Sequence, residues 1–131
     1  MSKTILVVED NADNMYVLDH LLTRKGYTVV QATSGAEVLA LLDREPPALV
    51  LMDMQMPGMN GYTAVERLRA EGRWADLPVI AVTASSMPGD RERTLAVGCT
   101  DYVSKPINPR ELLQLVAHYV EGVAGADRSD R

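Results

Sequence analysis

Four short apolar segments of this chain each end on a polar side chain that can take part in chemistry. Segments of this kind, separated by stretches with the period of a helix, are typical of buried strands in a parallel sheet. The carboxyl ends of such strands meet at one edge of the sheet, where open α/β folds place their ligand sites. The segments, each with the residues that follow it, are 4–8 with Glu9 and Asp10, 48–52 with Asp53, 78–82 with Thr83, and 102–104 with Lys105.

The stretches between these segments carry apolar residues at helical spacing. Met15, Leu18 and Leu22 would share one face of a helix over 11–25, and Gly26 is a suitable stop signal. Alternating strands and helices predict an α/β fold: a (βα)5 doubly wound, parallel five-stranded sheet with helices on both faces. The same reasoning predicts a second strand at 27–32 and helices at about 34–45, 62–71, 90–97 and 109–120.

Several polar residues are best explained by local helix structure. Ser34, with Glu37 three residues later, resembles a capping box at a helix start. Asn108 is the expected N-cap of the last helix, with Pro109 in the first helical position. The arginines in the helical stretches are interpreted as solvated charges, namely Arg67, Arg69, Arg91 and Arg93.

Three carboxylates, those of Glu9, Asp10 and Asp53, would meet at the sheet edge. Like charges at close range repel one another unless a cation neutralises them. Carboxylate oxygens are ligands that Mg²⁺ and Mn²⁺ prefer, so the cluster predicts a divalent-metal site. Lys105, at the end of the last strand segment, would supply positive charge for an anion beside that metal.

Composition excludes several classes of protein. The chain has 131 residues, which fits one domain, and a net charge of −5, which argues against direct binding to nucleic acid. No apolar run approaches the ~20 residues that a membrane span requires, and no signal peptide is recognisable. The single cysteine, Cys99, excludes an intrachain disulfide, and a cytoplasmic location is expected. The composition of 122–131 predicts a flexible tail after a domain at 1–121.

On these residues the chain resembles the receiver domains of two-component response regulators, which accept phosphate from histidine kinases. The resemblance covers about residues 4–120, nearly the whole chain. It is specific because the matched residues follow one another in the right order at the right strand ends. These residues are Glu9, Asp10, Asp53, Thr83, Lys105 and Pro106.

Three further features fit the same family: the loop 56–61, Gly98 before the last strand, and the segment 86–92. The last of these is most similar to single-domain receivers of the cell-division type and to receivers of hybrid kinases. The resemblance implies a flavodoxin-like sheet with the strand order 2-1-3-4-5.

The resemblance implies that Asp53 is phosphorylated and that Mg²⁺ or Mn²⁺ is the cofactor. The implied metal ligands are Glu9, Asp10, Asp53 and the backbone carbonyl of Gln55. Many relatives carry aspartate where this chain has Glu9, whose side chain is one methylene longer. Direct ligation by Glu9 and ligation through a water molecule therefore both stay open.

The remaining site residues are also assigned through the resemblance. Lys105, followed by a cis bond to Pro106, would contact the phosphoryl oxygens. Thr83 would hydrogen-bond the phosphoryl group, and Tyr102 would fill the space that Thr83 vacates, which makes the two residues a switch. In the family, the positions of Gln55 and Ser85 tune the rate of dephosphorylation.

The implied function is that of a single-domain response regulator. Asp53 would take a phosphoryl group from a histidine kinase or a histidine phosphotransfer protein, and phosphorylation would switch binding to a downstream effector protein. Such a domain promotes its own phosphoryl transfer and dephosphorylation but is a signalling domain and not an enzyme. Candidates for the effector face are Met87, Arg91, Leu95, Tyr102 and Arg110.

The same residues bear on three other functions. The chain could be a receiver cut from a longer response regulator or hybrid kinase, which leaves the chemistry unchanged. A phosphatase of the haloacid-dehalogenase type would need a second acid two residues after its nucleophile, where this chain has Gln55. A mononucleotide binder of the flavodoxin type would need a phosphate loop at 9–13, which is acidic here and would repel phosphate.

Overall fold

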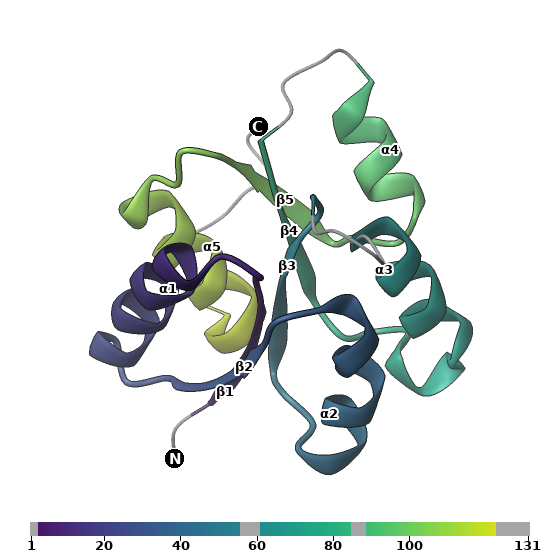
Figure 1. Ribbon diagram of the computed structural model, residues 1–131, viewed down its shortest axis with the longest axis horizontal. Helices are drawn as coiled ribbons and strands as arrows, with labels where there is room; N and C mark the ends of the chain where they lie inside the picture. Colours follow the sequence, from purple (N-terminus) through teal and green to yellow (C-terminus); the bar gives the residue numbers. More distant parts are fainter. Residues whose placement is uncertain (1–2, 56–60, 85–88, 123–131) are drawn as a thin grey trace.

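The sheet at the centre of the molecule has five parallel strands in the order β2-β1-β3-β4-β5 (Figure 1). The computed structural model describes residues 3–55, 61–84 and 89–122. This sheet confirms both the predicted architecture and the strand order that the resemblance implied. The strands are β1 Thr4–Val8, β2 Thr28–Ala32, β3 Leu49–Asp53, β4 Val79–Thr83 and β5 Asp101–Ser104.

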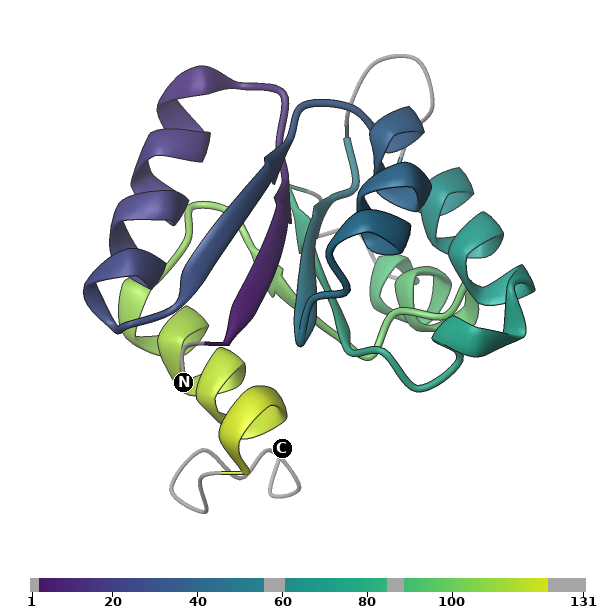
Figure 2. The same cartoon turned by 90° about the horizontal axis from the view of Figure 1, so that it is seen from below.

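Helices connect the strands and cover both faces of the sheet, with α1 and α5 on one face and α2, α3 and α4 on the other (Figures 1 and 2). The tail expected at 122–131 lies outside the described residues from 123 onward. None of the described helices combines the length and the apolar character needed to span a membrane. The helices are α1 Ala12–Arg24, α2 Val38–Arg44, α3 Gly61–Ala70, α4 Asp90–Ala96 and α5 Pro109–Glu121, with 3-10 turns η1 Gly35–Glu37 before α2 and η2 Gly72–Trp74 after α3.

The core has two layers because alternate residues of a strand point to opposite faces of the sheet. On β1, Ile5 and Val7 pack into the layer under α1 and α5, whereas Leu6 and Val8 pack into the layer under α2 and α3. Every residue of β3 and of β4 is buried, since helices cover both faces of these central strands. The residues at the ends of β3 and β4 are therefore held by rigid, fully packed elements.

The predicted capping box at Ser34 is wrong in detail. Ser34 precedes η1, but its side chain makes no capping hydrogen bond to the backbone. The Glu37 carboxylate turns back to Thr33 instead and accepts hydrogen bonds from its backbone N–H at 3.0 Å and its hydroxyl at 2.9 Å. The chain therefore forms a 3-10 turn before the helix, and the α-helix begins only at Val38.

Arg69, which was expected to be a solvated charge, is half-buried and joins three segments. Its guanidinium donates hydrogen bonds to the carbonyl oxygens of Gly98 at 2.9 Å and Trp74 at 2.6 Å. It also reaches the hydroxyl of Thr100 at 3.4 Å. The expectation is wrong because these partners come from turns that only the folded chain brings beside α3.

Candidate functional site

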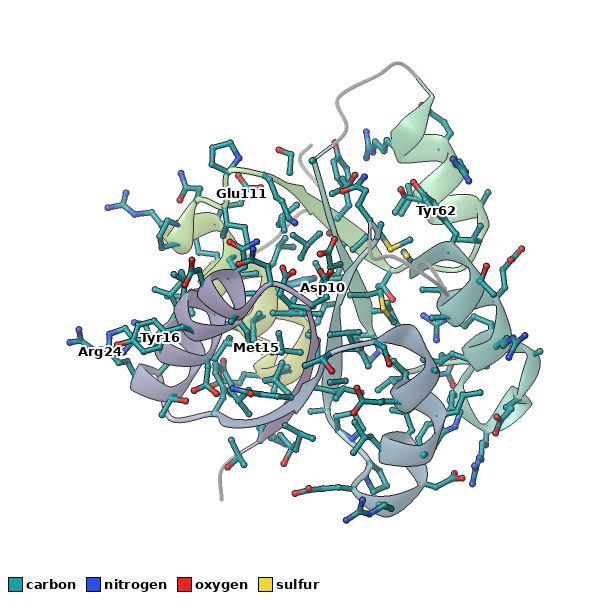
Figure 3. The ribbon with its side chains drawn as sticks, in the orientation of Figure 1. Asp10, Met15, Tyr16, Arg24, Tyr62 and Glu111 are labelled. Carbon is teal, nitrogen blue, oxygen red and sulfur yellow. The ribbon has the colours of Figure 1, made fainter. Side chains whose placement is uncertain are left out.

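The carboxylates of Glu9, Asp10 and Asp53 come together at the carboxyl ends of β1 and β3. One oxygen from each lies within 4.8 Å of one oxygen from the other two. Glu9 and Asp53 are only 1% and 3% exposed, whereas Asp10 faces solvent. Figure 3 shows Asp10 near the middle of the molecule, between the helices of the two layers. The cluster thus combines one carboxylate in water with two that are withdrawn from it.

Glu9 is buried because it directly follows β1, whose ladder continues through the hydrogen bond from the Glu9 N–H to the Ala32 carbonyl at 2.9 Å. Its Oε2 accepts a hydrogen bond from the Asn11 N–H at 3.1 Å, while its buried Oε1 has no hydrogen-bond partner among the described residues. Burial away from water raises the pKa of the Glu9 carboxyl from 4.5 to about 7, and the neighbouring Asp53 carboxyl adds to the shift. The carboxylate form of Glu9 is therefore costly without a cation beside it.

Lys105 brings a positive charge to this cluster from the residue after β5. Its Nζ lies 3.4 Å from Asp53 Oδ2 and 3.9 Å from Glu9 Oε1. The Lys105 N–H donates to the Thr83 carbonyl at 2.8 Å, and the Lys105–Pro106 peptide bond is cis. The ammonium group therefore faces the acids, where it can also meet an anion bound to Asp53.

Asp53 is fixed by the loop that follows it. Its Oδ1 accepts a hydrogen bond from the Gln55 N–H at 3.0 Å. Gly61, at the start of α3, packs so closely that an added Cβ would lie 2.6 Å from Met54 Cα and 2.8 Å from the Asp53 carbonyl oxygen. This close approach requires glycine, and it lets α3 support the backbone that carries Asp53.

The Gln55 side chain makes a contact that sequence reasoning did not foresee. Its Nε2 donates to the buried Thr83 hydroxyl at 2.9 Å, and its Oε1 accepts from the Ala84 N–H at 2.8 Å. The amide thus connects the loop after β3 to the end of β4. The only signal in the sequence was a long amide side chain two residues after the candidate phosphoacceptor.

The candidate effector residues are partly brought together on α4, β5 and α5. Tyr102 is half-buried, and the Arg91 guanidinium lies over its ring, 5.8 Å from the centroid. Leu95 is 39% exposed, and Arg110 faces solvent on α5. Met87 and the tuning position Ser85 lie outside the described residues.

The arginines of α4, Arg91 and Arg93, are exposed as expected, but each guanidinium also lies over an aromatic ring. Besides Arg91 on Tyr102, the guanidinium of Arg93 lies 4.0 Å from the centroid of the Tyr62 ring. Figure 3 shows Tyr62, a residue of α3, on the side of that helix that faces α4. These cation–π contacts hold the short helix α4 to its neighbours on two sides.

The model of the response regulator receiver domain family matches residues 5–117. This chain belongs to that family. The polar-differentiation response regulator DivK of Brucella ovis is 38% identical over 120 residues, which cover 92% of this chain and 98% of that protein. The receiver is therefore a phosphoaccepting domain of two-component signalling and not a classical enzyme.

Solved receiver structures share the fold. The receiver domain of the sensor histidine kinase PA1611 from Pseudomonas aeruginosa, which has magnesium coordinated in its active-site cleft, superposes with a TM-score of 0.84 at 33% identity. The match covers 92% of this chain and 98% of that one. The Saccharomyces cerevisiae receiver domain of Ssk1, solved with the histidine phosphotransfer protein Ypd1, gives a TM-score of 0.84 at 26% identity, covering 91% and 89% of the two chains.

Proposed function

We propose that Asp53 is the phosphoacceptor of this receiver. The observation that carries the proposal is the Asp53 carboxylate at the end of a buried strand, with its Oδ2 3.4 Å from Lys105 Nζ. An Asp53 oxygen attacks the phosphorus of a phosphohistidine; the P–N bond breaks, its electron pair goes to the imidazole nitrogen, and this nitrogen takes up a proton from water. Lys105 stabilises the negative charge that is spread over the phosphoryl oxygens.

The donor set suits Mg²⁺ or Mn²⁺. Asp10 and Asp53 would hold the ion together with the backbone carbonyl of Gln55, and Glu9 would reach it directly or through water. Oxygen ligands of this kind are those that hard divalent cations prefer. A cation would also neutralise the buried Oε1 of Glu9, which accepts no hydrogen bond from the described residues. When bound, the ion supplies positive charge that offsets the carboxylates and the phosphoryl oxygens. The magnesium in the PA1611 receiver supports this assignment.

Thr83 and Tyr102 form the proposed switch. A phosphoryl group on Asp53 draws the Thr83 hydroxyl toward it, and the ring of Tyr102 moves into the space that this leaves. Tyr102 is paired in register with Ala81, two residues before Thr83 on the adjacent strand. Phosphorylation thereby shifts the equilibrium between two packings of one surface. A partner that binds one packing more tightly then responds to the local charge.

The partners follow from the same chemistry. The phosphoryl group comes from a histidine kinase or a histidine phosphotransfer protein, and the Ssk1–Ypd1 complex supports this pairing for a receiver of this fold. A downstream effector protein binds the surface formed by α4, β5 and α5. If the chain is a receiver within a longer regulator or hybrid kinase, the effector is another part of that protein.

The first test is phosphorylation by a small donor. The protein is incubated with acetyl phosphate and saturating Mg²⁺, and its intact mass is measured beside that of Asp53→Asn. We expect a gain of one phosphoryl group in the wild type and none in the variant. Asp19→Asn, a change at a partly exposed carboxylate on α1 outside the acidic cluster, is the matched control and should be phosphorylated like the wild type.

Two results would contradict the proposal. A phosphoryl gain that survives in Asp53→Asn would place the acceptor elsewhere. No gain in the wild type at saturating donor and Mg²⁺ would leave a receiver that signals by binding alone.

A further inference from the structure

The side chain of Gln55 forms hydrogen bonds with two groups at the end of β4 at the same time. Its amide lies between the Thr83 hydroxyl, 2.9 Å away, and the Ala84 backbone N–H, 2.8 Å away. The orientation of the amide is fixed by chemistry, because a backbone N–H can only donate and therefore faces the amide oxygen. The Gln55 backbone N–H meanwhile donates to Asp53 Oδ1 at 3.0 Å. One residue thus contacts the candidate phosphoacceptor with its backbone and the candidate switch with its side chain.

We propose that the Gln55 amide is an internal placeholder for the phosphoryl group, which holds Thr83 and Ala84 in their unphosphorylated position until it is displaced. This inference rests on the proposed phosphorylation of Asp53. β3 and β4 are adjacent, with Asp53 in register with Val82, so the end of β3 lies beside residues 83 and 84, and a group attached to Asp53 would lie near them. There it meets the same hydroxyl and N–H that the amide already uses.

The competition between amide and phosphoryl group has a clear direction. A phosphoryl group carries three strong acceptor oxygens and close to two negative charges, whereas the amide offers one neutral oxygen. Hydrogen bonds to an ionised acceptor are roughly twice as strong as neutral ones, so the phosphoryl oxygens displace the amide. Gln55 is exposed, and its released side chain can be solvated. Because the two amide hydrogen bonds must be broken, phosphorylation is less favourable than it would be without the Gln55 side chain.

The test compares the wild type with Gln55→Met, which keeps the length of the side chain and the backbone but removes both side-chain hydrogen bonds. Gln31→Met is the matched control, because the Gln31 amide also donates a side-chain hydrogen bond, to Asp19 at 2.7 Å, on the distant strand β2. The first measurement is amide hydrogen exchange at Ala84 by NMR, without any phosphodonor. The second is the initial rate of phosphorylation by acetyl phosphate at saturating Mg²⁺, followed by intact mass. Fluorescence of Trp74 during urea unfolding checks that all variants fold.

In Gln55→Met we expect exchange at Ala84 and the initial rate of phosphorylation each to rise about fivefold, the factor that corresponds to one net hydrogen bond of about 1 kcal/mol. Gln31→Met should change neither. Unchanged exchange at Ala84 would overturn the placeholder, and so would an unchanged or lower rate of phosphorylation. If the wild type itself gains no phosphoryl group, the proposed function has failed, whereas the exchange at Ala84 still reports on the amide contact alone.

Discussion

At the scale of single residues, burial makes the ionised form of the Glu9 carboxyl unfavourable in the folded protein. Its carboxyl is buried; one oxygen accepts a hydrogen bond from the Asn11 N–H, and the other has no hydrogen-bond partner in the part of the chain that the structure describes. Lys105 Nζ is 3.9 Å from that second oxygen, which is too far for a hydrogen bond. The charge state of Glu9 therefore depends on what else occupies the sheet edge.

We expect the metal-free protein to lose stability as the pH rises, because the pKa of Glu9 is about 7 in the folded state and 4.5 without its surroundings. The folded state holds this proton more tightly, so the stabilisation is complete below the lower value and is lost as the pH passes through the higher one. We expect urea unfolding in EDTA to give a lower free energy of unfolding at about pH 8 than at about pH 5. The contribution of Glu9 to this difference is at most ~3 kcal/mol.

The matched variants are Glu9→Gln and Glu66→Gln. The first removes the titrating group at nearly constant size, so its free energy of unfolding should depend less on pH. The second changes an exposed glutamate on α3 and should follow the wild type. An identical pH dependence in Glu9→Gln and the wild type would show that Glu9 is not the group responsible.

Gly61 should tolerate no side chain. A Cβ there would lie 2.6 Å from Met54 Cα, which is backbone and cannot move without shifting the neighbouring Asp53. We expect Gly61→Ala to lower the free energy of unfolding by about 1–3 kcal/mol and to slow phosphorylation by acetyl phosphate. Gly72→Ala is the control, since a Cβ at Gly72 meets no atom of the described residues within 4 Å. Equal effects of the two changes would contradict the argument.

At the scale of helices and strands, the features that local sequence determines were predictable. β3 and β4 are runs of apolar residues buried on both faces, and Asn108 caps α5 by accepting from the Glu111 N–H, as expected. The turn at Ser34 differs because Glu37 has a better partner in Thr33.

Contacts between distant segments were not predictable in the same way. Arg69 finds carbonyls from turns 5 and 29 residues away, and Gln55 finds Thr83 28 residues later in the chain. No periodicity or motif encodes such partners. The acidic cluster of the site was predictable for the opposite reason: parallel strands bring their carboxyl ends together whatever lies between them.

Arg69 should therefore matter more for stability than an arginine on a helix surface. Arg69→Met leaves the Gly98 and Trp74 carbonyls without their donor, so we expect the free energy of unfolding to fall by about 2 kcal/mol. Urea unfolding followed by the fluorescence of Trp74 measures this. Arg67→Met, at an exposed position on the same helix, should change it little. Similar values for the two variants would mean that the Arg69 contacts contribute nothing net.

At the scale of the whole molecule, three acidic side chains gather at one end of the sheet. The protein already carries a net charge of −5. We expect Mg²⁺ to raise the melting temperature, with a stabilisation that grows by about 1.4 kcal/mol for each tenfold increase in free ion above the dissociation constant. The shift should be larger at about pH 8 than at about pH 5, because the carboxyls must lose their protons to bind a metal.

Thermal unfolding over a series of Mg²⁺ concentrations measures this stabilisation. Asp10→Asn should reduce it, whereas Asp19→Asn, outside the cluster, should not. A shift of the same size in Asp10→Asn would mean that the ion binds elsewhere.

The end of α5 is held at the end of the molecule opposite to the acidic cluster. Glu121 accepts a hydrogen bond from the hydroxyl of Tyr27, just before β2, where the strands begin. Burial and the Glu121 carboxylate raise the pKa of Tyr27, so its hydroxyl keeps the proton that it donates. Figure 2 shows this end of α5 near the start of β1. A fluorophore or a surface tether attached after Gly122 would thus leave the acidic end of the molecule open, and immobilised protein would present the proposed phosphoacceptor, Asp53, to a phosphodonor in solution.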